Sequence, residues 1–212
     1  MRTRTLSILC LALALLLPVS SFAPKAMGAE LSEPRLILEK GINAVLKDLS
    51  DPAISTPNGR EAVLKRVENT ISELFDFREL SARSVGPNWK SFTPDQQQRL
   101  VDNFTTLLRE TYLEKFDAYS GEKVTYSGEV MNTKGNRAEI QTTIEIDNKS
   151  IPIAYRLIKK ATWAVYDVNI EGVSLVQNFR SQFQSVLLNG EIEELIALVA
   201  QKAEETRAEN KK

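Results

Sequence analysis

The sequence predicts an α+β fold in which helices cover one face of a curved, four-stranded antiparallel sheet. The spacing of apolar residues is helical in the first half of the chain, alternates within residues 123–171 and becomes helical again afterwards. Short polar turns separate the alternating segments, as is typical of antiparallel neighbours. A sheet with one apolar face has to bury that face against helices. No Gly/Ser-rich linker or internal repeat divides the chain, so we expect a single domain.

Four helices are predicted before the sheet. Ser32 and Pro34 supply an N-cap and a helix-starting proline for the first, and a break at residues 56–59 separates it from the second. A short helix is predicted over Phe77–Ser84. Residues Thr93–Gln96 then combine a first-turn proline with a capping box and begin the longest helix. The apolar stripes of the three longer helices are Leu38, Ile42, Val45, Leu46 and Leu49; Val63, Leu64, Val67, Ile71, Leu74 and Phe75; and Leu100, Val101, Phe104, Leu107, Leu108 and Tyr112.

Four strands and two further helices complete the predicted order. The clearest strand covers residues 137–147, where Ala138, Ile140, Thr142, Ile144 and Ile146 alternate with charged and polar residues. The other strands are expected over 123–130, from 151 onward and over 163–171. One helix is expected to stop at Asn189-Gly190. A last one leads into a charged tail, about residues 204–212, that we expect to be flexible.

The composition excludes most catalytic chemistry. The 212-residue chain contains no His, and its single Cys, Cys10, lies in the N-terminal apolar run. Ser–His and Cys–His nucleophile pairs and the commonest metal ligand are therefore absent from the sequence. A Gly-rich phosphate-binding loop is absent as well, so ATP hydrolysis is not expected. We predict no enzyme activity, no cofactor and no metal site.

Residues 1–29 are predicted to be a signal peptide, which leaves residues 30–212 as the mature domain. Two arginines precede an apolar run, Leu6–Val19, that is shorter than the ~20 residues of a membrane-spanning helix. Small residues follow, and we expect cleavage after Gly28 or Ala29. The alternative is an uncleaved N-terminal anchor.

The charge of the mature domain argues against nucleic acid. Three of the 27 basic residues and none of the 28 acidic ones lie in the signal peptide, so four more acidic than basic residues remain. A mildly acidic chain without a basic block is a poor ligand for nucleic acid or for an anionic lipid surface. We expect no nucleic-acid partner.

Four motifs, in order, resemble those of the toluene-tolerance or Mla-type periplasmic phospholipid-binding proteins. They are Phe75–Ser81; Gly86 and Trp89 leading into Thr93–Gln96; Ile151–Leu157; and Trp163–Phe183, which turns from a strand directly into an amphipathic helix. The similarity extends over nearly the whole mature chain, from about Pro34 to Ala203.

The resemblance implies a function that the composition cannot supply. The fold would be similar to the cone of nuclear transport factor two with extra helices, and a glycerophospholipid would be the bound ligand. The protein would be a periplasmic monomer that shuttles this lipid and supports outer-membrane lipid asymmetry and solvent tolerance. Its partners would be an inner-membrane ABC transporter complex with a substrate-binding ring protein and an outer-membrane lipoprotein complex. A related branch of hopanoid-associated lipid carriers is an alternative.

The resemblance also suggests where the ligand would lie, because the acyl chains would occupy the interior of the cone. The candidate wall residues are Phe75, Trp89, Phe104, Leu108, Tyr112, Ile144, Tyr155, Tyr166, Val168, Phe179 and Phe183. Each could equally belong to an ordinary packed core. Arg156 is a further candidate, since a mid-strand guanidinium could reach a lipid phosphate or pair with Asp167 on the next strand.

Two other classes of protein stay open on the sequence. One is a cone-fold lyase or isomerase with a carboxylate of raised pKa in the cavity, for which Asp167 is the mid-strand candidate. The other is an interaction module whose interior is filled with side chains, since apolar stripes by themselves usually indicate packing.

Overall fold

The computed structural model describes residues 31–113, 121–146 and 149–210, and Leu31–Lys212 forms one compact unit. The predicted signal peptide and its cleavage site lie outside the described residues. No helix in the described ranges is long and apolar enough to cross a membrane.

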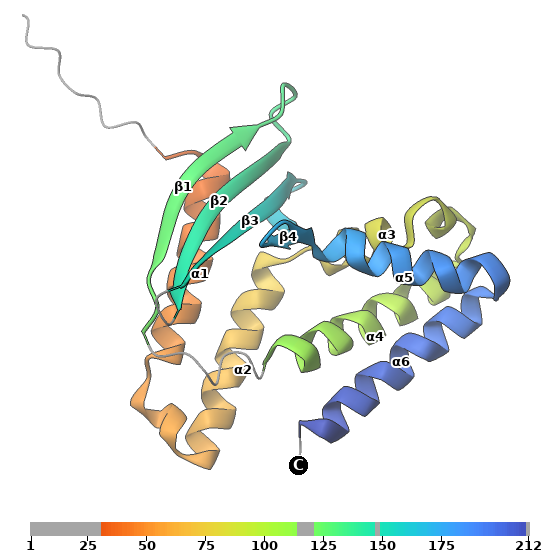
Figure 1. The fold of residues 1–212 in the computed structure, drawn as a ribbon, viewed down its shortest axis with the longest axis horizontal. Coiled ribbons are helices and arrows are strands. Elements are labelled where there is room, and N and C mark those ends of the chain that lie inside the picture. Colours follow the sequence, from red (N-terminus) through yellow and green to blue (C-terminus); the bar gives the residue numbers. More distant parts are fainter. Residues whose placement is uncertain (1–30, 114–120, 147–148, 211–212) are drawn as a thin grey trace, which may run out of the picture. The chain divides into compact units, whose positions relative to one another are not determined.

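The first two helices form an antiparallel pair beside the sheet (Figure 1). Helix α1 covers Glu33–Leu49, and the Ser32 side chain caps it by accepting a hydrogen bond from the Arg35 N–H at 3.3 Å. A short 3-10 helix, η1 (Pro52–Ser55), leads into α2 (Pro57–Leu74), which Thr56 caps in the same way. The cap at Ser32 was predicted, whereas residues 56–59 were expected to be a break and instead provide the cap and first turn of α2.

The next segment bends the chain away from the sheet. Helix α3 (Phe77–Val85) ends at Gly86, whose φ of 74° lies in the left-handed region that favours glycine. A Cβ there would also come within 2.8 Å of the Arg180 guanidinium. The 3-10 helix η2 (Gly86–Ser91) follows, and then α4 (Pro94–Leu113).

The capping box at the start of α4 is confirmed, and it fixes where this helix begins. The Thr93 N–H donates to Gln96 Oε1 at 2.9 Å, and the Gln96 N–H donates to Thr93 Oγ1 at 3.3 Å. Two N–H groups that the helix itself cannot pair are satisfied by this exchange.

The predicted antiparallel meander is confirmed, with one strand more than expected. The sheet contains β1 (Val124–Met131), β2 (Arg137–Ile146), β3 (Lys149–Lys159), β4 (Trp163–Ile170) and β5 (Val173–Ser174), in that order across the sheet. Sequence reasoning missed β5 because two residues are too short to show a period. It forms because Glu171 and Gly172, both at positive φ, fold the chain back onto β4.

Two helices close the chain. Helix α5 (Leu175–Asn189) follows β5 directly, and α6 (Ile192–Glu209) packs along α4. The charged tail from about residue 204, which the sequence predicts to be flexible, is helical through Glu209. Ala203 is buried, Arg207 pairs with Glu110 at 3.2 Å, and Asn210 donates to the Glu110 carbonyl at 2.8 Å, so the helix is held to its end.

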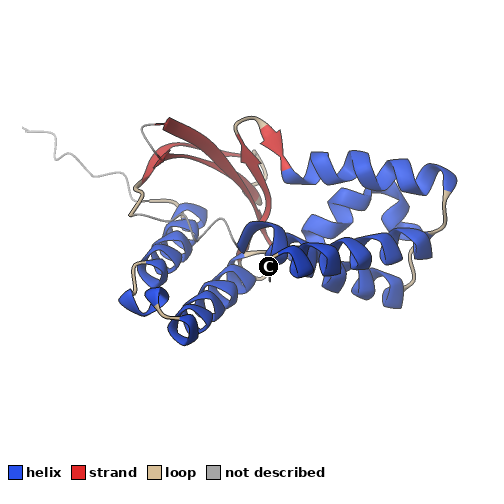
Figure 2. Ribbon diagram, turned by 60° about the horizontal axis from the view of Figure 1, so that its bottom comes forward, coloured by secondary structure: helices blue, strands red, loops and turns tan. Residues whose placement is uncertain are grey.

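The apolar interior is divided into two clusters. The sheet cluster joins the concave face of the sheet to α1 and α2, and the helical cluster lies among α3, η2, α4, α5 and α6. Figure 2 shows how the helices and the sheet are arranged. The buried members of the sheet cluster are Leu38, Ile42, Leu74, Ala138, Ile140, Leu157, Trp163, Val165 and Val168. The buried members of the helical cluster are Leu80, Val85, Phe92, Leu100, Phe104, Leu107, Leu108, Val176, Phe183, Leu195, Ile196, Val199 and Ala203.

Candidate functional site

The concave face of the sheet is only partly filled by side chains from the helices. Strand register places Ala138 beside Leu157, Ile140 beside Tyr155, and Ile144 beside Ile151 on this face. Burial is complete around Ala138 and Leu157, where Leu38, Ile42 and Leu74 pack onto the sheet. Toward the other end of the strands the apolar side chains are only half-buried: Val124, Ile144, Ile146, Ile151, Ile153 and Ile170. A concave, accessible apolar surface next to a fully packed core is a typical binding site for an apolar ligand.

Tyr155 lies on this surface next to its fully buried part, opposite Ile140. Burial raises the pKa of its phenol well above the ordinary range, and the neighbouring Tyr126 adds to the shift. Its side chain nevertheless keeps accessible surface and is classed with the half-buried residues packed against the sheet cluster. A group that is enclosed by protein and still accessible is expected on the wall of a recess.

Tyr126 occupies the neighbouring position on the edge strand, beneath α1. The Arg35 guanidinium lies 3.9 Å from the centre of its ring, and Arg35 is paired with Glu39 at 3.2 Å. Burial, with a smaller contribution from Glu39, raises the pKa of Tyr126 to about 12. Its hydroxyl is buried and has no hydrogen-bond partner among the residues that the structure describes.

Phe75 connects the concave face to the helices. It is half-buried, packs against both clusters and pairs with Val165 in a single parallel bridge. The next residue, Asp76, donates its N–H to the Val165 carbonyl at 2.8 Å and caps α3 through its side chain. Phe75 therefore lies at the junction of the two clusters, where a wall residue is expected.

Tyr112, at the end of α4, is also half-buried, and burial raises the pKa of its phenol.

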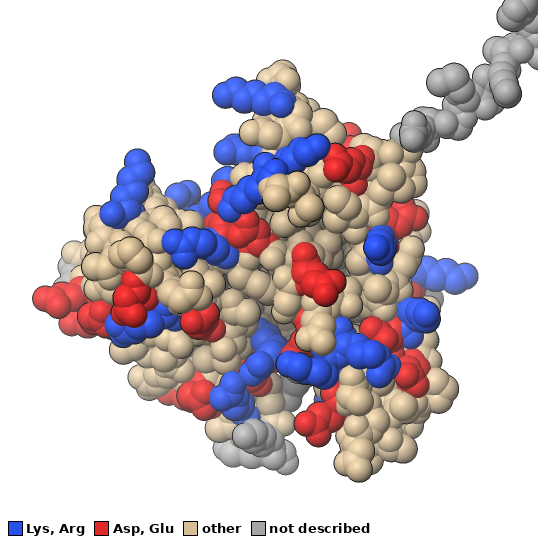
Figure 3. Space-filling model, turned by 180° about the vertical axis from the view of Figure 1, so that it is seen from behind, with Lys and Arg blue, Asp and Glu red and all other residues tan. Residues whose placement is uncertain are grey.

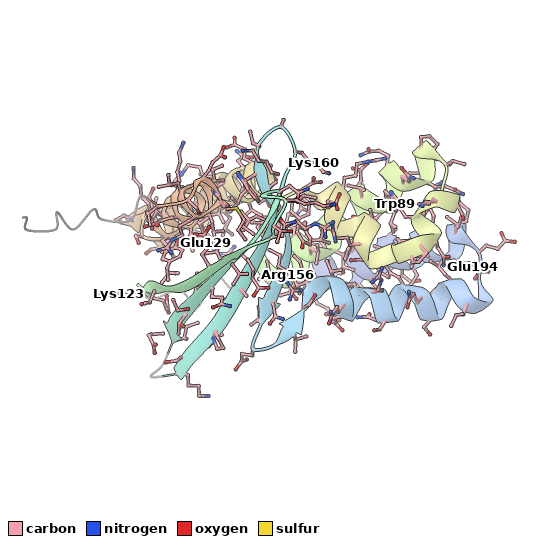
Figure 4. All side chains as sticks on the ribbon, turned by 90° about the horizontal axis from the view of Figure 1, so that it is seen from above. Trp89, Lys123, Glu129, Arg156, Lys160 and Glu194 are labelled. Atoms are coloured by element: carbon pink, nitrogen blue, oxygen red, sulfur yellow. The ribbon has the colours of Figure 1, made fainter. Side chains whose placement is uncertain are left out.

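Other predicted wall residues lie in packed core. Phe104 is 0% exposed, and its ring contacts the rings of Phe179 and Phe183 at centroid distances of 4.7 and 5.1 Å. Leu108 is buried in the same cluster. Trp89, labelled in Figure 4, is half-buried at the edge of this cluster, and the centre of its ring is 5.7 Å from that of Phe92. Helix-on-helix packing leaves Phe104, Leu108 and Phe183 at most 6% exposed, and their place in a cavity wall stays a prediction.

Tyr166 lies apart from both clusters. A bulge between Arg156 and Leu157 places Val165 and Val168 on the concave face and leaves Tyr166 under the Arg83 guanidinium, at 4.1 Å. Val168 therefore lies on the concave face and Tyr166 lies outside it, and a place in the ligand wall stays a prediction for each. Ile144 is on the concave face and half-buried.

Arg156 is engaged on the convex face of the sheet. It pairs with Asp167 at 3.0 Å and with Glu139 at 2.9 Å, so the predicted alternative of an ion pair with Asp167 is confirmed. Asp167 is 2% exposed and also accepts hydrogen bonds from the Ser174 hydroxyl at 2.7 Å and the Val176 N–H at 3.1 Å. These contacts fasten the start of α5 to the sheet. They leave Asp167 with structural partners on both oxygens and away from the concave face.

A separate pocket of about 460 Å³ lies at the corner where α5 meets α6, and no sequence signal pointed to it. It is open and lined by both polar and apolar groups. The lining residues are Asn88, Ser91, Gln96, Leu187, Gly190, Glu191, Ile192 and Glu193. Glu193 is already paired with Arg99 at 2.7 Å, and its pKa is lowered chiefly by that hydrogen bond.

Lys and Arg alternate with Asp and Glu over the face shown in Figure 3, without a large area of one sign. No group of His, Cys, Asp and Glu in the described ranges could hold a metal ion.

The fold and site together define an α+β protein with an incompletely filled, apolar concave sheet. A family model described as MlaC protein matches residues 39–201, and the chain belongs to this family. The chain is 20% identical over 177 residues to the intermembrane phospholipid transport system binding protein MlaC of Haemophilus influenzae, covering 81% of this chain and 83% of that protein. Its fold is similar to that of the phospholipid-binding protein from Ralstonia solanacearum in complex with a phospholipid. The TM-score is 0.74 at 22% identity, over 83% of this chain and 99% of that chain.

Sequence reasoning missed several residues of the concave face. Tyr126, Ile153, Ile170 and Leu175 pack against the sheet cluster and stay half-buried. Ile153 precedes the predicted Tyr155 by two positions, so strand alternation alone could have found it. Leu175 could not be found in this way, because it is the first residue of a helix and reaches the sheet only through the turn before β5.

Proposed function

We propose that this protein is a periplasmic carrier that binds a phospholipid against the concave face of its sheet and moves it between the two membranes. The observation that carries the proposal is the half-buried apolar row beyond the sheet cluster, from Tyr155 and Ile153 to Ile144. Membership of the MlaC family and the phospholipid-binding names of the two similar proteins support the same ligand.

The energetics suit a carrier. Burying a methylene group is worth ~0.8 kcal/mol relative to water, so two acyl chains of about 15 carbons gain more than about 20 kcal/mol. A bilayer offers the lipid nearly the same gain. The free energy of transfer between a bilayer and an apolar protein surface is therefore close to zero. The barrier to transfer is the exposure of the acyl chains to water.

The proposal includes docking partners that shield the lipid. An inner-membrane ABC transporter complex with a substrate-binding ring protein and an outer-membrane lipoprotein complex would deliver or accept the lipid, and the ATPase would set the direction. The carrier itself would act as a monomer after removal of residues 1–29. Nothing in its sequence resembles an ATP-binding loop, so energy has to be supplied by a partner.

The lyase hypothesis loses its candidate carboxylate. Asp167 faces the convex side of the sheet and is held by Arg156, Ser174 and the Val176 N–H. We propose no catalytic role for it. A hopanoid-related ligand would use the same apolar surface and is distinguished by the identity of the extracted lipid.

The test is lipid extraction from protein purified without detergent, followed by mass spectrometry. We expect one diacyl phospholipid per chain in the native protein. Ile153→Glu places a charge on the concave face and should abolish the bound lipid while the circular dichroism spectrum remains native. The matched control is Thr125→Glu, at an exposed position whose side chain alternates away from Tyr126 on β1. It should retain the lipid. A native protein without lipid, or equal lipid content in both variants, would contradict the proposal.

A further inference from the structure

Two tyrosine hydroxyls on the concave face have no hydrogen-bond partner among the residues that the structure describes. Tyr126 on β1 and Tyr155 on β3 flank β2, where Tyr126 is opposite Thr142 and Tyr155 is opposite Ile140. Neither phenol makes a hydrogen bond to any residue in the described ranges, and the oxygen of Tyr126 is fully buried. A buried hydroxyl without a partner is unfavourable, and most buried polar groups in native proteins have one.

Thr142 lies between them on β2, and its hydroxyl, unlike theirs, has a hydrogen-bond partner in the protein. Its hydroxyl donates to the Ile153 carbonyl at 3.0 Å, although the residue is only 2% exposed. The two phenols have no such acceptor, because the other side chains around them on this face are mainly apolar. The nearby Arg35 offers only donors, and its carboxylate partner is Glu39.

Both phenols are hydrogen-bond donors at every physiological pH, since burial raises the pKa of each above its ordinary value. A ligand that binds this surface therefore needs apolar chains. Close to these chains it needs hydrogen-bond acceptor groups that are not also hydrogen-bond donors. The ester carbonyl oxygens of a diacyl glycerolipid have these properties, and there are two of them.

We propose that the hydroxyls of Tyr126 and Tyr155 donate hydrogen bonds to the two ester carbonyl oxygens of the bound diacyl lipid. This inference rests on the proposed function. It identifies the ester groups as the part of the lipid that the protein recognises. It places the glycerol end of the lipid beneath α1, over the edge of the sheet formed by β1, β2 and β3. It also predicts a preference for ester-linked over ether-linked lipids, whose chains and head groups can be identical.

The experiment is a competition between phosphatidylethanolamine with two palmitoyl esters and its dihexadecyl ether counterpart, mixed equally in vesicles. Native mass spectrometry measures the ratio of the two lipids bound to the full-length mature protein. A neutral hydrogen bond corresponds to about a fivefold preference, so the wild-type protein should favour the ester lipid by about 25-fold. Tyr126→Phe and Tyr155→Phe should each reduce the ratio to about fivefold, and the double variant should bind both lipids equally.

A stability measurement separates this role from a purely structural one. Tyr126→Phe removes an unpaired hydroxyl, so the lipid-free variant should melt at the same temperature as the wild-type protein or at a higher one. Thr142→Val is the matched control, because its hydroxyl already has a protein partner. It should lower the melting temperature and leave the ester-to-ether ratio unchanged.

The outcomes are distinguishable. If the wild-type protein binds both lipids equally, the ester contacts are refuted and the carrier function stands. If Tyr126→Phe lowers the melting temperature without changing the ratio, the hydroxyl has a protein or water partner and the inference is overturned. If the wild-type protein takes up neither lipid, the proposed function itself fails.

Discussion

The two apolar clusters of this protein are packed in different ways. In the helical cluster, three phenylalanine rings interlock, with Phe104 and Phe179 4.7 Å apart and Phe179 and Phe183 5.8 Å apart. In the sheet cluster, helix side chains cover one part of the concave face and leave Ile144, Ile153 and Tyr155 half-buried. The same kinds of apolar residue therefore form a core in one region and an accessible wall in the other.

The difference follows from the shapes of the surfaces. Helices pack ridge into groove along their length, so α4, α5 and α6 can fill the space between them. A twisted, curved sheet diverges from a straight helix, and α1 and α2 can touch it over only part of its length. Curvature therefore leaves apolar surface that the described helices do not fully cover, and this surface is what we assign to the ligand.

The largest expected effect tests whether the two regions differ in stability. Phe104→Ala should cost about 3–5 kcal/mol, because it opens a cavity in a fully packed cluster. Ile153→Ala removes a half-buried side chain and should cost about 1–2 kcal/mol. Urea unfolding of the lipid-free variants measures both. Equal losses would mean that the concave face is packed as tightly as the helical cluster, and the comparison would fail.

A smaller effect tests the contacts of Asp167 that hold the start of α5 to the sheet. Asp167→Asn removes the buried charge that Arg156, Ser174 and the Val176 N–H share, and should cost about 2–3 kcal/mol. Hydrogen exchange should accelerate in the first turn of α5, which these bonds hold to the sheet. Glu139→Gln, which alters the half-exposed partner of the same arginine, should cost less than about 1 kcal/mol. Unchanged exchange in α5 after Asp167→Asn would show that the helical cluster alone positions this helix.

The smallest effect concerns acid stability at the start of α1. The pKa of Glu33 is lowered mainly by the hydrogen bond from Lys159, at 2.7 Å, and then by that from Trp163 Nε1, at 3.1 Å. A carboxylate whose pKa is lowered by folding adds stability above its unfolded pKa, about 4.3, and this contribution disappears as the pH falls through the folded value.

Glu33→Gln should therefore lower the melting temperature slightly at pH 7 and by less near pH 3. Glu73→Gln, at an exposed position on α2, is the control and should behave as the wild-type protein at both values. A Glu33→Gln variant that differs equally from the wild-type protein at both pH values would show that its carboxylate charge does not hold α1 to the sheet.

Local signals predicted most elements because each depends on a few neighbouring residues. The capping box at Thr93 and Gln96 and the turn before α2 are fixed by hydrogen bonds within four residues. The alternation in β2 predicted its concave and convex faces correctly. Strand β5 and the ordered end of α6 were missed, since the first depends on pairing with β4 and the second on contacts with Glu110, about 100 positions earlier.

The sequence by itself determined the order of helices and strands, the apolar side of each and the family resemblance, because periodicity and motifs are local properties of the chain. It could not determine which apolar residues are core and which are wall. Phe104 and Tyr155 look alike as aromatic residues on apolar stripes, yet Phe104 is enclosed by rings from α5 and Tyr155 stays half-buried beside the sheet cluster. That distinction depends on how a curved sheet and straight helices meet, and only the tertiary structure decides it.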